Sequence, residues 1–263
     1  MENKERNTNE EPINENVHTY DNGFHPKEVK LKEDYKLYRR GIFFRIGRKL
    51  LIAFFVVVLW FAKTFVWGYK VKGKKNLKKI KGGVILCNHT HQLDAFMICT
   101  SLFFKSIYIT MLESNLGFGF VSGIFRLGGA VPIPTERNLF KRFNKETPEI
   151  IKKGHFVLVY PEAALMPYCD HIRPFMSGAF HIAMNADCVI IPTVMTFHKP
   201  RGLYKLTRRK KPCMHYNILP PYYPKDMGNK RLTMDTAMNE INKIMSDYFI
   251  ENSDYYYENG CKK

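Results

Sequence analysis

The chain of 263 residues is long enough for one α/β domain with extensions, and its apolar content suffices for a substantial core. Its formal net charge of +17 predicts partners that carry negative charge, such as phosphate head groups or an acidic carrier protein. The six cysteines are scattered without paired spacing, which argues against a disulfide framework or a zinc site and fits reduced cytosolic thiols.

The first 36 residues differ in composition from the rest of the chain. They are rich in Asn, Glu and Lys and poor in large aliphatic side chains, and they lack the pattern of a secretory signal. Such a segment buries too little apolar surface to fold alone, so residues 1–36 are predicted to be a polar, disordered tail. Residues 253–263 are predicted to form a second tail.

Residues 50–68 are apolar throughout except for Lys63 and Thr64, and they match the length needed to cross a hydrocarbon core. Basic clusters flank this segment on both sides, whereas a single span has positive charge mainly on one side. We therefore predict that residues 37–70 form a membrane-associated helical hairpin on the cytoplasmic face of the cell membrane, with lysines against anionic lipid. A single transmembrane span is the alternative, because it has the same length and hydropathy.

From about residue 71, short apolar runs alternate with helical patterns. This predicts an α/β domain over residues 71–252, with a mixed, partly parallel sheet flanked by helices. Pro148 is expected to break or restart the helix in which it falls. The expected strands are residues 84–87, 106–110, 131–134, 156–160 and 189–195, and the expected helices are residues 95–104, 139–153, 178–184 and 231–249.

The stretch from Val84 to Asp94 delivers His89 from an apolar strand into a polar turn, and Asp94 follows five positions later. On one continuous helix, residues i and i+5 lie roughly 140° apart, so the pair meets only if Asp94 lies in a helix that begins after the turn. A carboxylate in that position holds an imidazole in one tautomer and stabilises its cation. The spacing therefore predicts a general base that deprotonates a hydroxyl.

Three further blocks follow this one in a fixed order, and together they resemble those of the glycerolipid acyltransferases, which include the bacterial 1-acyl-glycerol-3-phosphate acyltransferases. The resemblance covers roughly residues 71–200, behind the apolar segment. A glycine–alanine helix start at residues 175–180 adds to it. The four blocks are residues 88–94, 128–133, 157–162 and 190–193.

The resemblance implies direct transfer of a fatty acyl group from an acyl thioester to a lysophospholipid hydroxyl, without a covalent enzyme intermediate. The donor is acyl-coenzyme A or acyl carrier protein as co-substrate, and no bound cofactor or metal is expected. The first expectation for the acceptor is 1-acyl-sn-glycerol-3-phosphate, which gives phosphatidic acid. In the family pattern His89 is the base, Asp94 orients it, and Glu162 helps to fix the acceptor.

Two departures from the family pattern concern the cations that bind the acceptor phosphate. Thr135 occupies the expected basic position after the second block, and Arg137 follows two residues later. Leu165 stands where the third block usually has an arginine, and Arg173 is a candidate replacement, as are Lys141 and Arg142. We therefore predict Arg137, Glu162 and Arg173 as substrate-binding residues and keep other lysophospholipids as alternative acceptors.

Three rival functions remain. A metal-dependent hydrolase would suit His89 and His91, but Asp94 lies one residue too far along for the usual cluster, and Ala95 stands where another ligand is needed. A nucleic-acid-binding protein would suit the charge alone, and no recognition motif accompanies the lysines. A membrane-bound thioesterase or hydrolase that uses the same dyad on water stays open, whereas the absence of a G-x-S-x-G elbow argues against a serine lipase.

Overall fold

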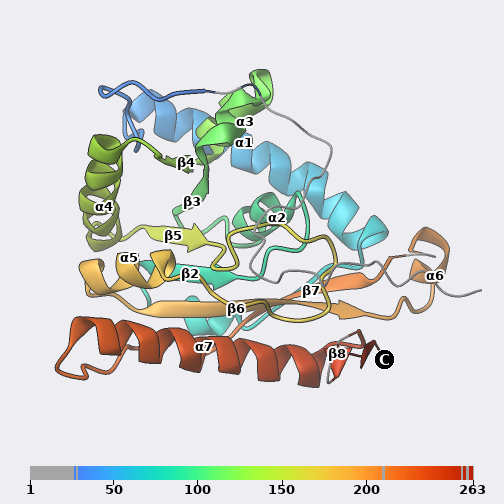
Figure 1. Cartoon of the computed structure of the whole chain (residues 1–263). Helices are drawn as coiled ribbons and strands as arrows, with labels where there is room; N and C mark the ends of the chain where they lie inside the picture. The colour runs from blue at the N-terminus through green and yellow to red at the C-terminus, as the bar shows by residue number, and fades with distance from the viewer. Residues whose placement is uncertain (1–26, 28, 209–210, 256, 259–260, 263) are drawn as a thin grey trace, which may run out of the picture.

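A seven-stranded sheet forms the centre of the computed structural model, which describes residues 27, 29–208, 211–255, 257–258 and 261–262 (Figure 1). The strand order is β1-β7-β6-β2-β5-β3-β4; β6 and β7 pair antiparallel, and the other neighbours pair in parallel. The predicted mixed, partly parallel sheet is thus confirmed. The strands are β1 (Lys70–Lys72), β2 (Gly83–Cys87), β3 (Ile107–Leu112), β4 (Ala130–Ile133), β5 (Phe156–Val159), β6 (Ile190–His198) and β7 (Cys213–Ile218).

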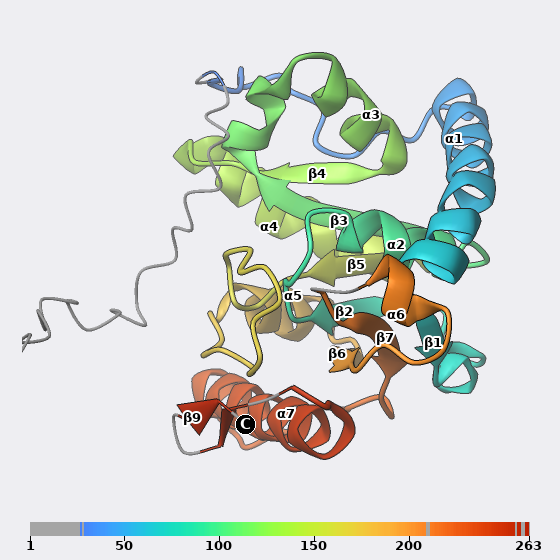
Figure 2. The same ribbon diagram turned by 90° about the vertical axis from the view of Figure 1, so that its right-hand side faces the viewer.

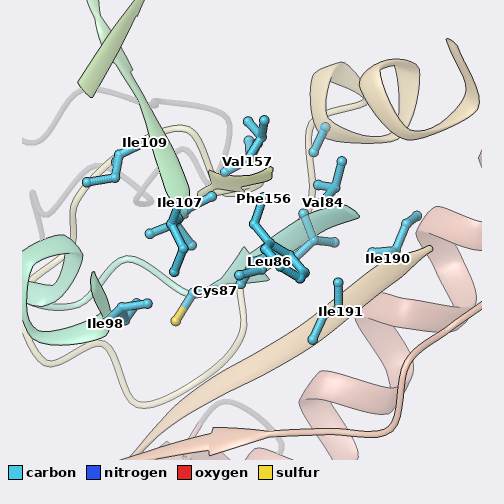
Figure 3. Close-up of a cluster of buried hydrophobic side chains, with 14 of the residues drawn as sticks. Val84, Leu86, Cys87, Ile98, Ile107, Ile109, Phe156, Val157, Ile190 and Ile191 are labelled. Atoms are coloured by element: carbon cyan, nitrogen blue, oxygen red, sulfur yellow. The ribbon is translucent and has the colours of Figure 1, made fainter. Parts of the chain in front are cut away.

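The central strands are apolar at almost every position because helices cover both faces of the sheet. Every residue of β2 and of β5 is buried. Figure 3 shows side chains from β2, β5 and β6 gathered in this core, among them Leu86, Phe156 and Ile191. The short apolar runs of the sequence therefore predicted buried parallel strands correctly.

The helices form two groups. Helix α7 contacts β6 and α5, and α5 also contacts α4, whereas α1 contacts α2 and α3 (Figure 1). Helix α3, the short α6 and strands β1 and β7 were not predicted from the sequence. The α-helices are α1 (Ile42–Phe61), α2 (Asp94–Ser101), α3 (Phe120–Gly128), α4 (Arg137–Lys152), α5 (Gly178–Ala186), α6 (Tyr204–Thr207) and α7 (Lys230–Asn252).

The apolar N-terminal segment forms one helix and not a hairpin. Helix α1 continues without a break into a π-helical turn, Ala62–Val66, because no proline interrupts these residues. Among the described residues this is the one helix long and apolar enough to cross a membrane, by length and composition only. Its most apolar window is 11% buried, and Phe43 is 87% exposed. The predicted hairpin is therefore wrong in form, and α1 is a candidate membrane-associated helix.

Pro148 does not break α4, which runs through it to Lys152. A proline inside a helix cannot donate the bond to the carbonyl four residues before it. Here the ring of Pro148 is buried, and the hydroxyl of the neighbouring Thr147 donates to the carbonyl of Phe143 at 2.6 Å. Helix α4 therefore continues through Pro148, and the expected break is wrong.

The predicted tails are shorter than expected. Residues 1–26 and 28 lie outside the described residues, but the backbone N–H of Leu31 donates to Glu113 at 2.9 Å, and Arg126 donates to the carbonyl of Lys36 at 2.6 Å. At the other end, the buried hydroxyl of Ser253 donates to the carbonyl of Phe197 at 3.0 Å. The inner residues of both segments are therefore part of the domain.

Candidate active site

The candidate site lies where the parallel strands β2, β5 and β6 end, at the edge that faces the viewer in Figure 2. The carboxyl ends of such strands open into the ligand crevice of α/β sheets. Asn88 fixes the turn after β2: its buried side chain accepts from the N–H of Met195 at 2.8 Å and donates to the carbonyl of Met195 at 3.1 Å. This pair of bonds ties the turn to β6 and sets the position of the histidine that follows.

The structure brings the predicted pair together as the sequence spacing required. The Nδ1 atom of His89 lies 2.8 Å from Oδ2 of Asp94, which is the first residue of α2 and fully buried. The backbone N–H groups of Thr90 and His91 donate to the same oxygen at 3.3 and 3.4 Å. The hydroxyl of Tyr160 donates to the other carboxylate oxygen, Oδ1, at 2.7 Å.

These contacts define the tautomer of His89. Since the carboxylate accepts, Nδ1 of His89 carries the proton and Nε2 has a free lone pair. Within the described part of the chain Nε2 has no hydrogen-bond partner, and the side chain is 24% exposed. The ring stacks on Tyr160 at 4.0 Å between centroids and 17° between planes. His89 is therefore an oriented base that a substrate hydroxyl can reach.

Glu162 and Arg173 form an ion pair with each other and do not line the opening of the site. The fully buried carboxylate of Glu162 accepts from Nε and a terminal nitrogen of Arg173, at 3.1 and 2.9 Å, and from the N–H of Arg173 at 3.3 Å. Burial raises the pKa of Glu162, against the charge and hydrogen bonds of Arg173 and a backbone bond from His89. Arg173 also donates to the carbonyl of Ala164. This arginine is thus engaged inside the protein and does not extend to a substrate phosphate.

Arg137 lies at the same edge of the sheet but away from the dyad. It is the exposed first residue of α4, which follows β4, and β4 is three strands from β2 in the sheet. At about 4.8 Å per strand, the two strand ends are roughly 14 Å apart. No hydrogen bond or ion pair joins its side chain to another described residue. Arg137 is therefore available to a ligand, at a distance from His89 that a phosphate-bearing acceptor would have to bridge.

A rim of aromatic and basic side chains from distant parts of the chain borders the dyad turn. The ring of His91 lies edge-on to Trp67 at 5.6 Å and to Tyr168 at 5.9 Å, and the amine of Lys211 lies 5.7 Å from the ring of Tyr168. Burial lowers the pKa of His91, Asp94 opposes this, and the charges of Arg208 and Lys211 add to it. His91 is thus neutral at pH 7, and its Nδ1 accepts from the N–H of Leu93 at 3.1 Å.

Tyr160 and Asn88 are the site residues that sequence reasoning missed. Tyr160 ends the expected strand 156–160 directly before Pro161 and Glu162, and the strand pattern predicts no role for its hydroxyl. Its position could have indicated a role, because Tyr160 places an aromatic ring with a hydroxyl group at the carboxyl end of β5, next to the strand β2 that precedes His89. Asn88 lies in the first block, and its residue type alone predicts no role for it.

Three consecutive side chains in the loop after β5, Cys169, Asp170 and His171, form the one group of possible metal ligands among the described residues. Their ligand atoms lie within 4.8 Å of one another. Contacts with Cys169 and Asp170, partly opposed by burial, raise the pKa of His171 to about 9. A charged imidazole cannot bind a cation, so a metal would have to displace this proton near neutral pH.

Comparison with known proteins agrees with this geometry. The model of the family described as "Acyltransferase" matches residues 68–196, about half of the chain. A 1-acyl-sn-glycerol-3-phosphate acyltransferase of Saccharomyces cerevisiae is 26% identical over 170 residues, which cover 63% of this chain and 54% of that protein. The corresponding enzyme of Pseudomonas aeruginosa is 28% identical over 128 residues, which cover 47% and 48%. The chain thus spans about half the length of the curated relatives it matches.

The fold has a solved counterpart. The crystal structure of the 1-acyl-sn-glycerophosphate acyltransferase of Thermotoga maritima superposes with a TM-score of 0.56 at 17% identity, over 80% of this chain and 83% of that one. At this identity the likeness concerns the fold alone.

Proposed function

The chain belongs to the acyltransferase family, and on this basis we propose that it is an O-acyltransferase that moves a fatty acyl group from an acyl thioester to the free hydroxyl of a lysophospholipid. One observation carries this proposal: a fully buried Asp94 fixes Nδ1 of His89 and leaves Nε2 free at the open edge of the sheet. That is the arrangement a base needs to activate a hydroxyl.

The reaction follows from the tautomer. Nε2 of His89 takes the proton of the acceptor hydroxyl while its oxygen attacks the thioester carbonyl carbon and forms the new C–O bond. The charge of Asp94 stabilises the imidazolium that results. The C–S bond then breaks, and the leaving thiolate takes the proton from His89, so the products are an ester and a free thiol. Coenzyme A or acyl carrier protein supplies the thiol part, and no bound cofactor is needed.

The first candidate acceptor is 1-acyl-sn-glycerol-3-phosphate, which would give phosphatidic acid, because the named relatives act on it. A second candidate is another lysophospholipid. It is favoured by Leu165, which replaces the usual arginine, and by the burial of Arg173 against Glu162. Exposed cations at the sheet edge and the rim, among them Arg137, Lys141 and Lys211, are then candidates to bind an acceptor phosphate.

We propose that the protein acts at the cell membrane with its site on the cytoplasmic face. Helix α1 exposes large apolar side chains along its length, among them Phe43, Phe54 and Trp60. Burial of such side chains in lipid is favourable by about 2 kcal/mol each. The net charge of +17 adds attraction to anionic lipid, which is also the source of the acceptor.

The test is acyl transfer from labelled acyl-coenzyme A and acyl carrier protein to a panel of lysophospholipids. We expect His89→Ala to lower the rate about 10³-fold while folding and membrane binding persist. His181→Ala, at an exposed position on α5, is the matched control and should leave the rate unchanged. Ester formed only with an acceptor other than 1-acyl-sn-glycerol-3-phosphate would select the second candidate. Free fatty acid without ester would show a thioesterase, and a folded His89→Ala protein with normal turnover would remove the dyad from the mechanism.

A further inference from the structure

We infer that Tyr160 is a positioning residue of the dyad, which holds Asp94 through its hydroxyl and His89 through its ring. This inference rests on the proposed function. Tyr160 directly follows β5, and β5 pairs with β2 in parallel, with Val159 opposite Leu86. The tyrosine therefore leaves the sheet beside the strand that precedes the histidine, and its side chain contacts both members of the dyad.

Two independent contacts fix this arrangement. The hydroxyl of Tyr160 donates to Oδ1 of Asp94 at 2.7 Å, and its ring lies parallel to the imidazole of His89 at 4.0 Å. The other oxygen of Asp94, Oδ2, accepts from His89 and from two backbone N–H groups. Within the described part of the chain, Tyr160 is the one donor to Oδ1. Removal of the hydroxyl would thus leave that side of a buried carboxylate without a partner.

The hydroxyl acts as a donor at every pH at which the protein would work. Burial, then the negative charge of Asp94, raises the pKa of Tyr160 well above its ordinary value, so it stays protonated. A neutral donor withdraws charge from the carboxylate without neutralising it. The carboxylate then attracts the imidazolium that forms during proton transfer less strongly than it would without this donor. The stacked ring limits rotation of the imidazole while the proton moves.

Other titratable groups near the dyad do not produce the same effect. Burial raises the pKa of Cys87 and of Tyr69, so both stay uncharged near neutral pH, and Cys99 on α2 behaves alike, with a pKa of about 11. Burial lowers the pKa of His91, which is neutral at pH 7. Glu162 is paired with Arg173. A substitution confined to the hydroxyl of Tyr160 leaves all of these groups in place.

Tyr160→Phe removes the hydroxyl and keeps the ring. We expect kcat to fall about tenfold with KM within about twofold, because the hydroxyl bonds Asp94 and does not face the acceptor. We also expect the acid limb of the profile of kcat/KM against pH to move up by roughly half a pH unit, since the carboxylate would hold the imidazolium more strongly. Tyr38→Phe is the control, because Tyr38 loses a buried hydroxyl bond of the same 2.7 Å, to Thr147, far from the site. That control should move neither quantity.

A second variant and a second readout complete the test. Tyr160→Leu removes ring and hydroxyl, and we expect a further loss of kcat that Tyr160→Phe does not show. The His89 ring proton, followed by NMR across the pH range, should shift its midpoint upward in Tyr160→Phe even if the acceptor is unknown. If the wild type acylated no lysophospholipid, the proposed function would be refuted, but the NMR midpoint would still test the role of Tyr160. An unmoved NMR midpoint and pH limb, with kcat like that of the Tyr38→Phe control, would overturn the role of Tyr160.

Discussion

Two buried carboxylates at the same edge of the sheet have opposite surroundings. The side chains of Asp94 and Glu162 are both fully buried. Asp94 is held by an imidazole, a phenol and two backbone N–H groups, whereas Glu162 is held by the full positive charge of Arg173. Dipolar partners leave a net negative charge on Asp94, and the guanidinium neutralises the charge on Glu162.

This difference predicts a chemical role for Asp94 and a structural role for Glu162. A buried charge without partners is costly, so each carboxylate needs its donors. The charge that remains at Asp94 is available to stabilise an imidazolium as it forms. The neutralised pair of Glu162 instead fixes the loop after β5 to the rest of the domain, because Asn242 of α7 donates to the carbonyl of Arg173 at 3.0 Å. Both acids lie in the sequence blocks that resemble the acyltransferases, but only Asp94 contacts the side chain of His89.

The largest expected effect is on the first carboxylate. Asp94→Asn keeps the size of the side chain and removes its charge, so the imidazolium loses its counter-charge and the wrong tautomer of His89 becomes accessible. We expect the rate to fall about 10³-fold, with KM little changed. Steady-state transfer assays with circular dichroism of the same samples would check this. A folded variant with an unchanged rate and pH profile would show that Asp94 has no part in the reaction.

The second carboxylate should respond in stability. Arg173→Met leaves Glu162 buried without its cation, and we expect a loss of about 3 kcal/mol at pH 8. The pKa of Glu162 is raised by burial already, and without Arg173 it would rise further, so the folded variant would bind a proton that the unfolded chain releases. The Arg173→Met variant should therefore regain stability as the pH falls through this raised pKa toward about 4.3, the ordinary pKa of a glutamate carboxyl group.

Unfolding by urea in mild detergent at pH 5 and pH 8 measures this recovery. The double variant Glu162→Gln, Arg173→Met is the matched control, because it has no carboxyl group to titrate and should show a smaller deficit that does not depend on pH. An equal deficit of Arg173→Met at both pH values would contradict the assignment of Glu162 and Arg173 as a structural ion pair.

The sequence predicted the dyad because an i, i+5 pair across a strand, turn and helix is a local arrangement. His89 and Asp94 are five positions apart in the sequence, so a short turn between them is enough to set their geometry. The partner of Glu162 is different: Arg173 lies 11 residues along an irregular loop, and no periodicity indicates where such a loop returns. Tyr160 reaches Asp94, which lies 66 residues away in the sequence, only because β5 pairs with β2.

The same reason explains the errors outside the site. The basic residues on both sides of α1 suggested a hairpin, but the segment contains no proline that would interrupt the helix. The helical structure also continues through Lys63, because the amine of Lys63 donates to Thr100 at 2.8 Å and to Ser101 at 3.1 Å on α2. That tertiary contact, which no pattern in the segment shows, satisfies the lysine inside an apolar run. Pro148 is likewise accommodated by burial rather than by local propensity.

A smaller effect is expected where a cation remains exposed. Because Arg173 is engaged by Glu162, the phosphate of the proposed acceptor would need another partner, and the side chain of Arg137 has no hydrogen bond or ion pair to another described residue. We expect Arg137→Ala to raise KM for a phosphate-bearing acceptor about fivefold without a change in kcat. Lys152→Ala, exposed at the other end of α4, should change neither. An equal rise in KM for a monoacylglycerol, which has no phosphate, would show that Arg137 does not bind the phosphate.

The smallest effect is expected at His91, the second histidine of the turn. It donates its backbone N–H to Asp94 at 3.4 Å, but its imidazole accepts from Leu93 and packs between Trp67 and Tyr168. A serine at this position would retain the backbone N–H that donates to the carboxylate. We therefore expect His91→Ser to keep kcat within about threefold of the wild type. Since burial lowers the pKa of His91, the imidazole is neutral above pH 7, so the alkaline part of the rate profile should be unchanged. A loss as large as that of Asp94→Asn would mean that the charge on Asp94 serves both histidines, and the contrast between the two carboxylates would have to be drawn around a triad.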